Sequence, residues 1–172
     1  LLWCGCLFIQ RRLRRTSVAL GHEAARSACR TYLPTLQTLF LTFALAVIWP
    51  LPLALLGVRL AGAVGSPEFV IALGKSCVIL SAMFAGFNWL RQFTRAGGLG
   101  EAHFGWDVDG LRCLRHAATW VIVCGLPLTL VVLLCEFQSN EAAKSSLGRM
   151  AFLALNAFLL LPIHLTMRAK DG

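Results

Sequence analysis

The chain has 172 residues, of which 58% are hydrophobic and only 14% are charged, and its formal net charge is +8. This composition excludes an ordinary soluble domain and indicates a membrane protein, because a typical soluble domain carries about 25% charged residues. The cations flank long apolar runs, as membrane topology requires, and therefore do not predict binding to nucleic acid. Leu1 lies within an apolar run, so we expect the sequence to be a piece of a longer protein.

The first 32 residues combine a short apolar segment with a basic link. Residues 1–9 are too few to cross a bilayer, which takes about 20 residues, and we interpret them as the end of a truncated transmembrane helix. Residues 10–32 form a basic link that we predict on the cytoplasmic face, because cations beside a span favour that side. Binding of a phosphate or an acidic lipid is the alternative role for these cations. The cluster behind the prediction is Arg11, Arg12, Arg14 and Arg15.

Residues 33–90 are predicted to form a first transmembrane hairpin. Residues 33–57 contain no formal charge and, as a helix, would extend about 37 Å, which is enough to span a bilayer with some tilt. We expect Pro50 and Pro52 to kink or end this helix, because proline lacks a backbone donor. Three polar side chains at helical spacing are expected to hydrogen-bond to a neighbouring helix: Gln37, Thr38 and Thr42.

The second helix of this hairpin is predicted at residues 69–90. It is rich in small side chains, which let helices approach closely in lipid, so we expect it to pack against protein on at least one side. Lys75 is a cation inside this span, and two roles are open to it. The favoured one is snorkelling toward the interface near Glu68, and the other is part of an ion path.

Residues 91–116 are predicted to form a cytoplasmic connector between the hairpins. Cations mark both of its ends as cytoplasmic, so the chain leaves and returns on the same face: Arg91, Arg95, Arg112 and Arg115. A helix interior would not favour the glycine-rich break at Gly97, Gly98 and Gly100, and we interpret this break as a hinge.

An apolar stripe after the break predicts an amphipathic helix. Such a helix would lie in the headgroup layer, with Trp106 at the interface, before it turns into the membrane. Asp107 is expected to cap it. Together with His103 and Asp109, Asp107 also suggests acid-base or metal chemistry, but no further ligand or nucleophile accompanies these residues, and capping is the favoured interpretation. The stripe consists of Phe104, Val108, Leu111 and Leu114.

Residues 117–168 are predicted to form a second transmembrane hairpin. Its spans are expected at residues 117–136 and 147–167, joined by a short polar turn. Pro127 lies near the middle of the first span, and Pro162 lies in the second. Both are expected to kink their helices, because the proline ring crowds the preceding turn.

The distribution of cations decides the predicted orientation. Of the 16 lysines and arginines, twelve lie on the predicted cytoplasmic side and four lie on or toward the other side. The sequence thus predicts an all-α, polytopic membrane protein with two helical hairpins and the end of an earlier helix. The seven cysteines form no CxxC pair and are expected to be buried thiols. We expect no cofactor, no metal and no enzyme activity, because no phosphate loop, activated nucleophile or buried carboxylate is indicated.

The run Gly97–Trp106 (GGLGEAHFGW) resembles the connector of large mechanosensitive channels of the MscS superfamily, of the MscK (KefA) type. Three further runs resemble parts of the same channels: Leu36–Thr42, Trp49–Pro52 and Asn88–Arg91. The resemblance implies the membrane-embedded region that precedes the pore helix of a homo-heptameric channel in the inner membrane of a Gram-negative bacterium. It also implies ion transport, potassium included, and opening on hypoosmotic shock, with the pore outside these residues.

Within such a channel, we interpret the two hairpins as a lipid-exposed paddle that senses tension. We expect the paddle not to conduct, because its faces are built mainly from Leu, Val, Ile and Phe, which suit lipid and helix contacts. Membrane lipids are therefore expected partners. A membrane scaffold or accessory subunit remains an alternative, since its composition would be similar. A secondary transporter fragment is the other, although it would carry ionisable groups at broken helices near the membrane centre.

Overall fold

The computed structural model describes residues 33–96, 98–102, 104–138 and 144–168, and these residues form helices and turns with no strand. The predicted all-α class is therefore confirmed for this part of the chain. The predicted segments 1–9 and 10–32, with their four clustered arginines, lie outside it. The elements are α2 (Leu33–Val47), α3 (Pro50–Ala61), α4 (Glu68–Phe93), α5 (Leu99–Ala102), α6 (Val108–Trp120), the π-helical turn η1 (Val121–Gly125), α7 (Leu126–Phe137), the π-helical turn η2 (Lys144–Gly148) and α9 (Arg149–Arg168).

Two described helices are long and apolar enough to cross a membrane, and a bent pair adds a third candidate. The two are α4 and the continuous helix Val108–Phe137, which joins α6, η1 and α7. The bent pair is α2 with α3, which together are long enough for one span. For α9 the side chains are described only as far as Leu160, so the fourth span at 147–167 stays a prediction.

The helix Val108–Phe137 differs from the prediction of a surface helix that turns into the membrane near residue 117. It runs without a break through that position. Asp107 starts it, and the sequence from Leu111 to Trp120 contains no glycine or proline that would end it. The chain therefore enters the long apolar helix directly from the connector. The first span also ends later than expected, because α3 continues from Gly57 to Ala61 before the turn.

Contacts divide the chain into two compact units, and the described residues of the first are 33–48, 88–96, 98–102 and 104–118. This unit contains α2, the end of α4, α5 and most of α6. The described residues of the second unit are 49–87, 119–138 and 144–168. It contains α3, the greater part of α4, and α7 with α9.

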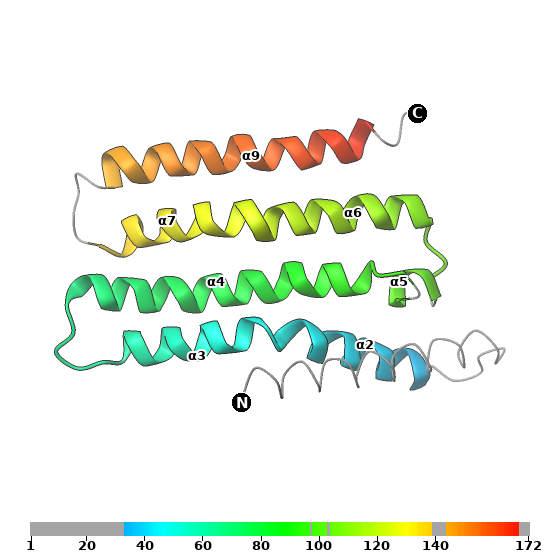
Figure 1. Ribbon diagram of the computed structural model, residues 1–172, viewed down its shortest axis with the longest axis horizontal. Helices are drawn as coiled ribbons and strands as arrows, with labels where there is room; N and C mark the ends of the chain where they lie inside the picture. Colours follow the sequence, from blue (N-terminus) through cyan, green and yellow to red (C-terminus); the bar gives the residue numbers. More distant parts are fainter. Residues whose placement is uncertain (1–32, 97, 103, 139–143, 169–172) are drawn as a thin grey trace. The chain divides into compact units, whose positions relative to one another are not determined.

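In the second unit, α3 runs beside α4, and α7 runs beside α9 (Figure 1). The α3–α4 contact is close enough to bring the two backbones together. A Cβ atom at Gly57 would lie 2.8 Å from the carbonyl oxygen of Gly74, and one at Gly74 would collide with the backbone nitrogen of Ala61. The expected close packing of the 69–90 helix is therefore confirmed. Gly125, at the end of η1, faces Phe158 of α9, whose ring would lie 3.8 Å from a Cβ atom at Gly125.

The described helices expose many large apolar side chains. An exposed apolar surface of this extent is uncommon on a soluble monomer and is suited to lipid. Each helix that is a candidate span contributes to it. The exposed residues include Leu36, Phe40, Phe43, Leu55, Leu56, Phe69, Trp120, Val123, Phe152 and Leu153.

Candidate functional site

The connector is built around an aromatic cluster at the end of α4. The Phe93 ring lies 5.7 Å from the Trp89 ring, 5.9 Å from the Phe104 ring and 5.4 Å from the Trp106 ring, between centroids. Tilted and edge-on pairs at these distances are attractive beyond the apolar area they bury. Phe104 and Trp106 remain about half exposed, at 54% and 51%. Sequence patterns do not single out Phe93, which lies near the start of the predicted connector.

Backbone hydrogen bonds fold the segment that follows α4 back on itself. The amide of Gly98 donates to Arg95 at 2.7 Å, and that of Trp106 donates to Gly100 at 3.1 Å. Gly105 adopts a φ of +60°, a left-handed conformation that favours glycine. Between these bonds, Leu99 is 1% exposed. The connector is therefore a packed element with its own small core.

Two of the glycines proposed as a hinge lie within this packing. A Cβ atom at Gly98 would lie 2.7 Å from the carbonyl oxygen of Arg95. One at Gly100 would lie 3.0 Å from the Leu111 side chain and 3.1 Å from the Phe93 ring. Their small size thus permits close contacts, whether or not the segment also bends. Gly97 and His103 lie outside the described residues, and the hinge stays a hypothesis.

The predicted apolar stripe is divided between two environments. Leu111 is 5% exposed and packs against the connector, so its expected contact with the headgroup layer is wrong. Phe104 and Val108 are exposed and remain available to lipid. Periodicity alone does not separate these cases, because a protein contact and a lipid contact both favour leucine.

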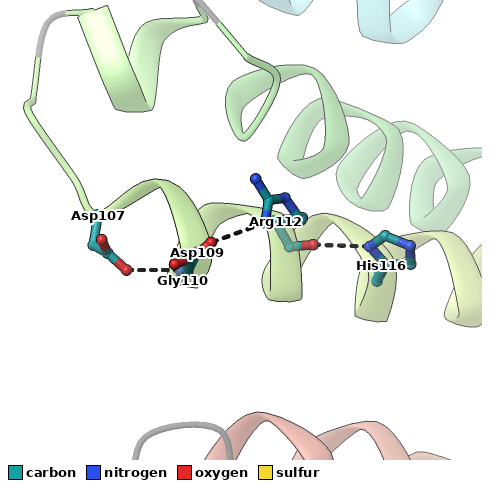
Figure 2. Close-up of polar contacts among 5 residues, drawn as sticks. All are labelled: Asp107, Asp109, Gly110, Arg112 and His116. Atoms are coloured by element: carbon teal, nitrogen blue, oxygen red, sulfur yellow. Dashed lines mark hydrogen bonds and ion pairs between the residues drawn. The ribbon is translucent and has the colours of Figure 1, made fainter.

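Polar contacts at the start of α6 support capping rather than catalysis (Figure 2). A carboxylate oxygen of Asp107 accepts a hydrogen bond from the Gly110 amide at 3.0 Å, as an N-cap residue does, and the predicted cap is confirmed. Asp109 pairs with Arg112 at 2.9 Å, and the Nδ1–H of His116 donates to the Arg112 carbonyl at 3.1 Å. Among the described residues, no group of His, Cys, Asp and Glu is arranged to hold a metal ion.

Several polar side chains in the described helices form hydrogen bonds within their own helices. Each side chain donates a hydrogen bond to the backbone carbonyl three or four residues earlier: Thr42 to Thr38, Ser76 to Ala72, Ser81 to Val78, Thr129 to Gly125 and Asn156 to Phe152. The expected interhelical bond of Thr42 is therefore wrong, and Gln37 is exposed. A hydroxyl that donates to a carbonyl of its own helix has its hydrogen bond there and is not needed to line an ion path.

Asn88 differs from these residues, because its amide reaches another helix. Its Nδ2 donates to the carbonyl oxygen of Ala46, in the last turn of α2, at 2.9 Å. Both residues are buried and belong to the first compact unit. Lys75 also reaches beyond its helix, since its Nζ lies 5.9 Å from the centre of the Phe137 ring, a distance suited to a cation–π contact.

Prolines mark the places where the described spans depart from regular helix. Pro50 begins α3 directly after the break from α2. Pro127 follows the π-helical turn η1, where the Leu126 amide donates to Val121, one residue farther back than in an α-helix. The wider turn makes room for the proline ring and its missing donor. Pro52 lies within the first turn of α3, and the α9 backbone runs through Pro162 as one helix.

The second unit contains an open cavity of about 500 Å³ where α7, η2 and α9 meet. Its lining combines apolar residues with two cations and one carboxylate. The lining residues are Val132, Cys135, Glu136, Lys144, Ser145, Gly148, Arg149, Phe152 and Leu153. The opposing charges of this lining define no single ligand.

Together, the apolar exposed spans and the packed connector define a polytopic α-helical membrane protein with no recognisable reaction centre among its described residues. The whole chain, residues 1–172, matches the family model of the mechanosensitive ion channel inner membrane domain 1. The chain therefore belongs to this family and forms membrane-embedded structure of an MscS-superfamily channel. The family is one of channel domains rather than of enzymes. No curated protein and no solved structure matches the chain significantly.

Proposed function

We propose that this chain is the tension-sensing, non-conducting part of an MscK-type mechanosensitive channel. The observation that supports the proposal most is which side chains of the described spans are exposed and which are buried. Large apolar side chains are exposed, whereas the buried hydroxyls of Thr42, Ser76 and Thr129 bond to their own helices. A water-filled ion path needs polar groups or small side chains that meet around an axis. The spans are better suited to contact lipid and one another.

In the proposed mechanism, the hairpins tilt as tension thins the bilayer, because a mismatch between apolar length and bilayer thickness costs free energy. A tilt that favours one pore conformation shifts the population of open channels. The connector, residues 91–116, lies on the cytoplasmic face and transmits movement from one hairpin to the next. Its packed aromatic cluster supports this role, since a segment with its own core moves as a unit.

The wider setting follows from the same proposal. The channel is a homo-heptamer in the inner membrane of a Gram-negative bacterium, and it opens on hypoosmotic shock to release ions, potassium included. The pore helix lies outside these residues. Membrane lipids are the partners of the exposed apolar faces.

Patch-clamp recording on reconstituted liposomes tests the division of roles. We expect the 172-residue chain alone to give no current under a pressure ramp, while the full channel in matched liposomes opens. Incorporation of the chain is checked by recovery of the protein with the vesicles. Tension-activated currents from the chain alone would contradict the proposal.

A further inference from the structure

The break between α2 and α3 leaves a backbone acceptor without its usual donor. In an α-helix, the carbonyl of Ala46 would accept a hydrogen bond from the amide four residues later. That position is Pro50, which has no N–H. Ala46 is 0% exposed, so water does not replace the missing donor. A buried carbonyl without a partner destabilises the state that contains it.

The side chain of Asn88 supplies a donor to this carbonyl. Its Nδ2 lies 2.9 Å from the Ala46 oxygen, and the residue is 2% exposed. The contact joins residues 42 positions apart, from α4 to the last turn of α2, within one compact unit. Burial of an amide is itself unfavourable unless it is hydrogen-bonded, so the two groups satisfy each other.

We infer that Asn88 is a positioning residue that replaces the donor removed by Pro50 and stabilises the last turn of α2 at the break. The effect of this bond on channel opening, given next, rests on the proposed tension-sensing function. Because the bond stabilises the end of α2 at the break, its loss lets the break adopt other conformations, and the channel opens at lower tension. Without Asn88, the Ala46 carbonyl loses this side-chain donor from α4.

Asn156 provides a matched control on another helix. Its amide also donates to a backbone carbonyl, that of Phe152, at 2.8 Å. That carbonyl lies in the uninterrupted helix α9 and keeps the Asn156 backbone amide as a donor. Replacing Asn156 by Leu therefore removes the same chemical group and leaves no carbonyl without a donor.

The first measurement is the distribution of distances across the break in the full channel in lipid nanodiscs. Spin labels are introduced at Phe40 in α2 and Leu55 in α3, both exposed, through a genetically encoded ketone amino acid, since the chain has seven native cysteines. Labelled subunits are diluted with unlabelled ones so that each assembly carries one pair. We expect Asn88→Leu to broaden the distribution and Asn156→Leu to leave it unchanged. An unchanged distribution in Asn88→Leu overturns the inference.

The second measurement restores the backbone donor. In a Pro50→Ala background, the amide of the new alanine serves the Ala46 carbonyl, so Asn88→Leu should produce no further broadening. Equal broadening in both backgrounds would show that Asn88 acts through packing and would overturn the inference. Such non-additivity is expected only of groups that share a partner.

The third measurement is the threshold tension of the same variants. We expect a lower threshold in Asn88→Leu and a native one in Asn156→Leu. A broadened distance distribution with a native threshold would overturn the gating role. The distance measurements need no tension, so they decide the role of Asn88 at the break even if the proposed tension-sensing function fails.

Discussion

The backbone contact between α3 and α4 leads to the most quantitative prediction. In Gly74→Ala, the new methyl group meets the backbone of Ala61 and the carbonyl oxygen of Gly57, which is 2.8 Å away. Backbone atoms do not move aside as the end of a side chain does, so the helices must separate. Such overpacking typically costs about 1–3 kcal/mol of the free energy of unfolding.

Gly86→Ala is the matched control for this substitution. It adds the same methyl group to the same helix, but at a position where no atom lies within 4 Å. Both variants gain the intrinsic helix preference of alanine, about 1 kcal/mol, so their difference isolates the steric cost. Titration with sodium dodecyl sulfate in mixed micelles, followed by circular dichroism, measures both free energies of unfolding. Equal stabilities of the two variants would refute the backbone contact.

Three further predictions concern the connector. Leu111→Ala should destabilise the connector by about 2–5 kcal/mol, because that side chain is buried. Val108 is exposed, so Val108→Ala should have a much smaller effect. The protease sensitivity of the connector in micelles measures both effects. Asp107→Ala should lower the stability of the helix start by about 0.5–2 kcal/mol, and Asp107→Ser should restore most of the loss in the same assay. If the connector is cytoplasmic, an impermeant thiol reagent should label Cys113 in inverted vesicles and not in intact cells, and labelling in intact cells would reverse the topology.

Much of the fold was predictable because local chemistry determines it. Long uncharged runs predict helices, since a membrane leaves the backbone few alternatives. Asp107 before an apolar stripe predicts a helix start, and its side chain does cap α6. The small residues of the 69–90 helix predict close packing, and Gly74 takes part in it. The superfamily was also predictable, because the Gly97–Trp106 run is specific and the whole chain matches the channel family.

The remaining features depend on contacts that periodicity does not specify. The stripe at Leu111 was assigned to the membrane surface, but it packs on protein, and leucine suits either environment. Thr42 was expected to bond to a neighbouring helix, although its own helix offers a nearer carbonyl at Thr38. The role of Asn88 follows from a partner 42 residues away. The sequence shows one of the two partners locally, because the four-residue spacing from Ala46 to Pro50 marks a carbonyl that lacks its usual helical donor. The other partner, Asn88, is not marked by any local pattern.

One recording tests most directly the central claim that these residues sense tension and do not conduct. In the full channel, Phe40→Asn with Phe43→Asn places amides on an exposed apolar face of α2, where they weaken its coupling to hydrocarbon. Gln37→Asn, which replaces one exposed amide by another, is the control. We predict a raised threshold tension and an unchanged unitary conductance in the double variant. A changed unitary conductance at the native threshold would contradict the account.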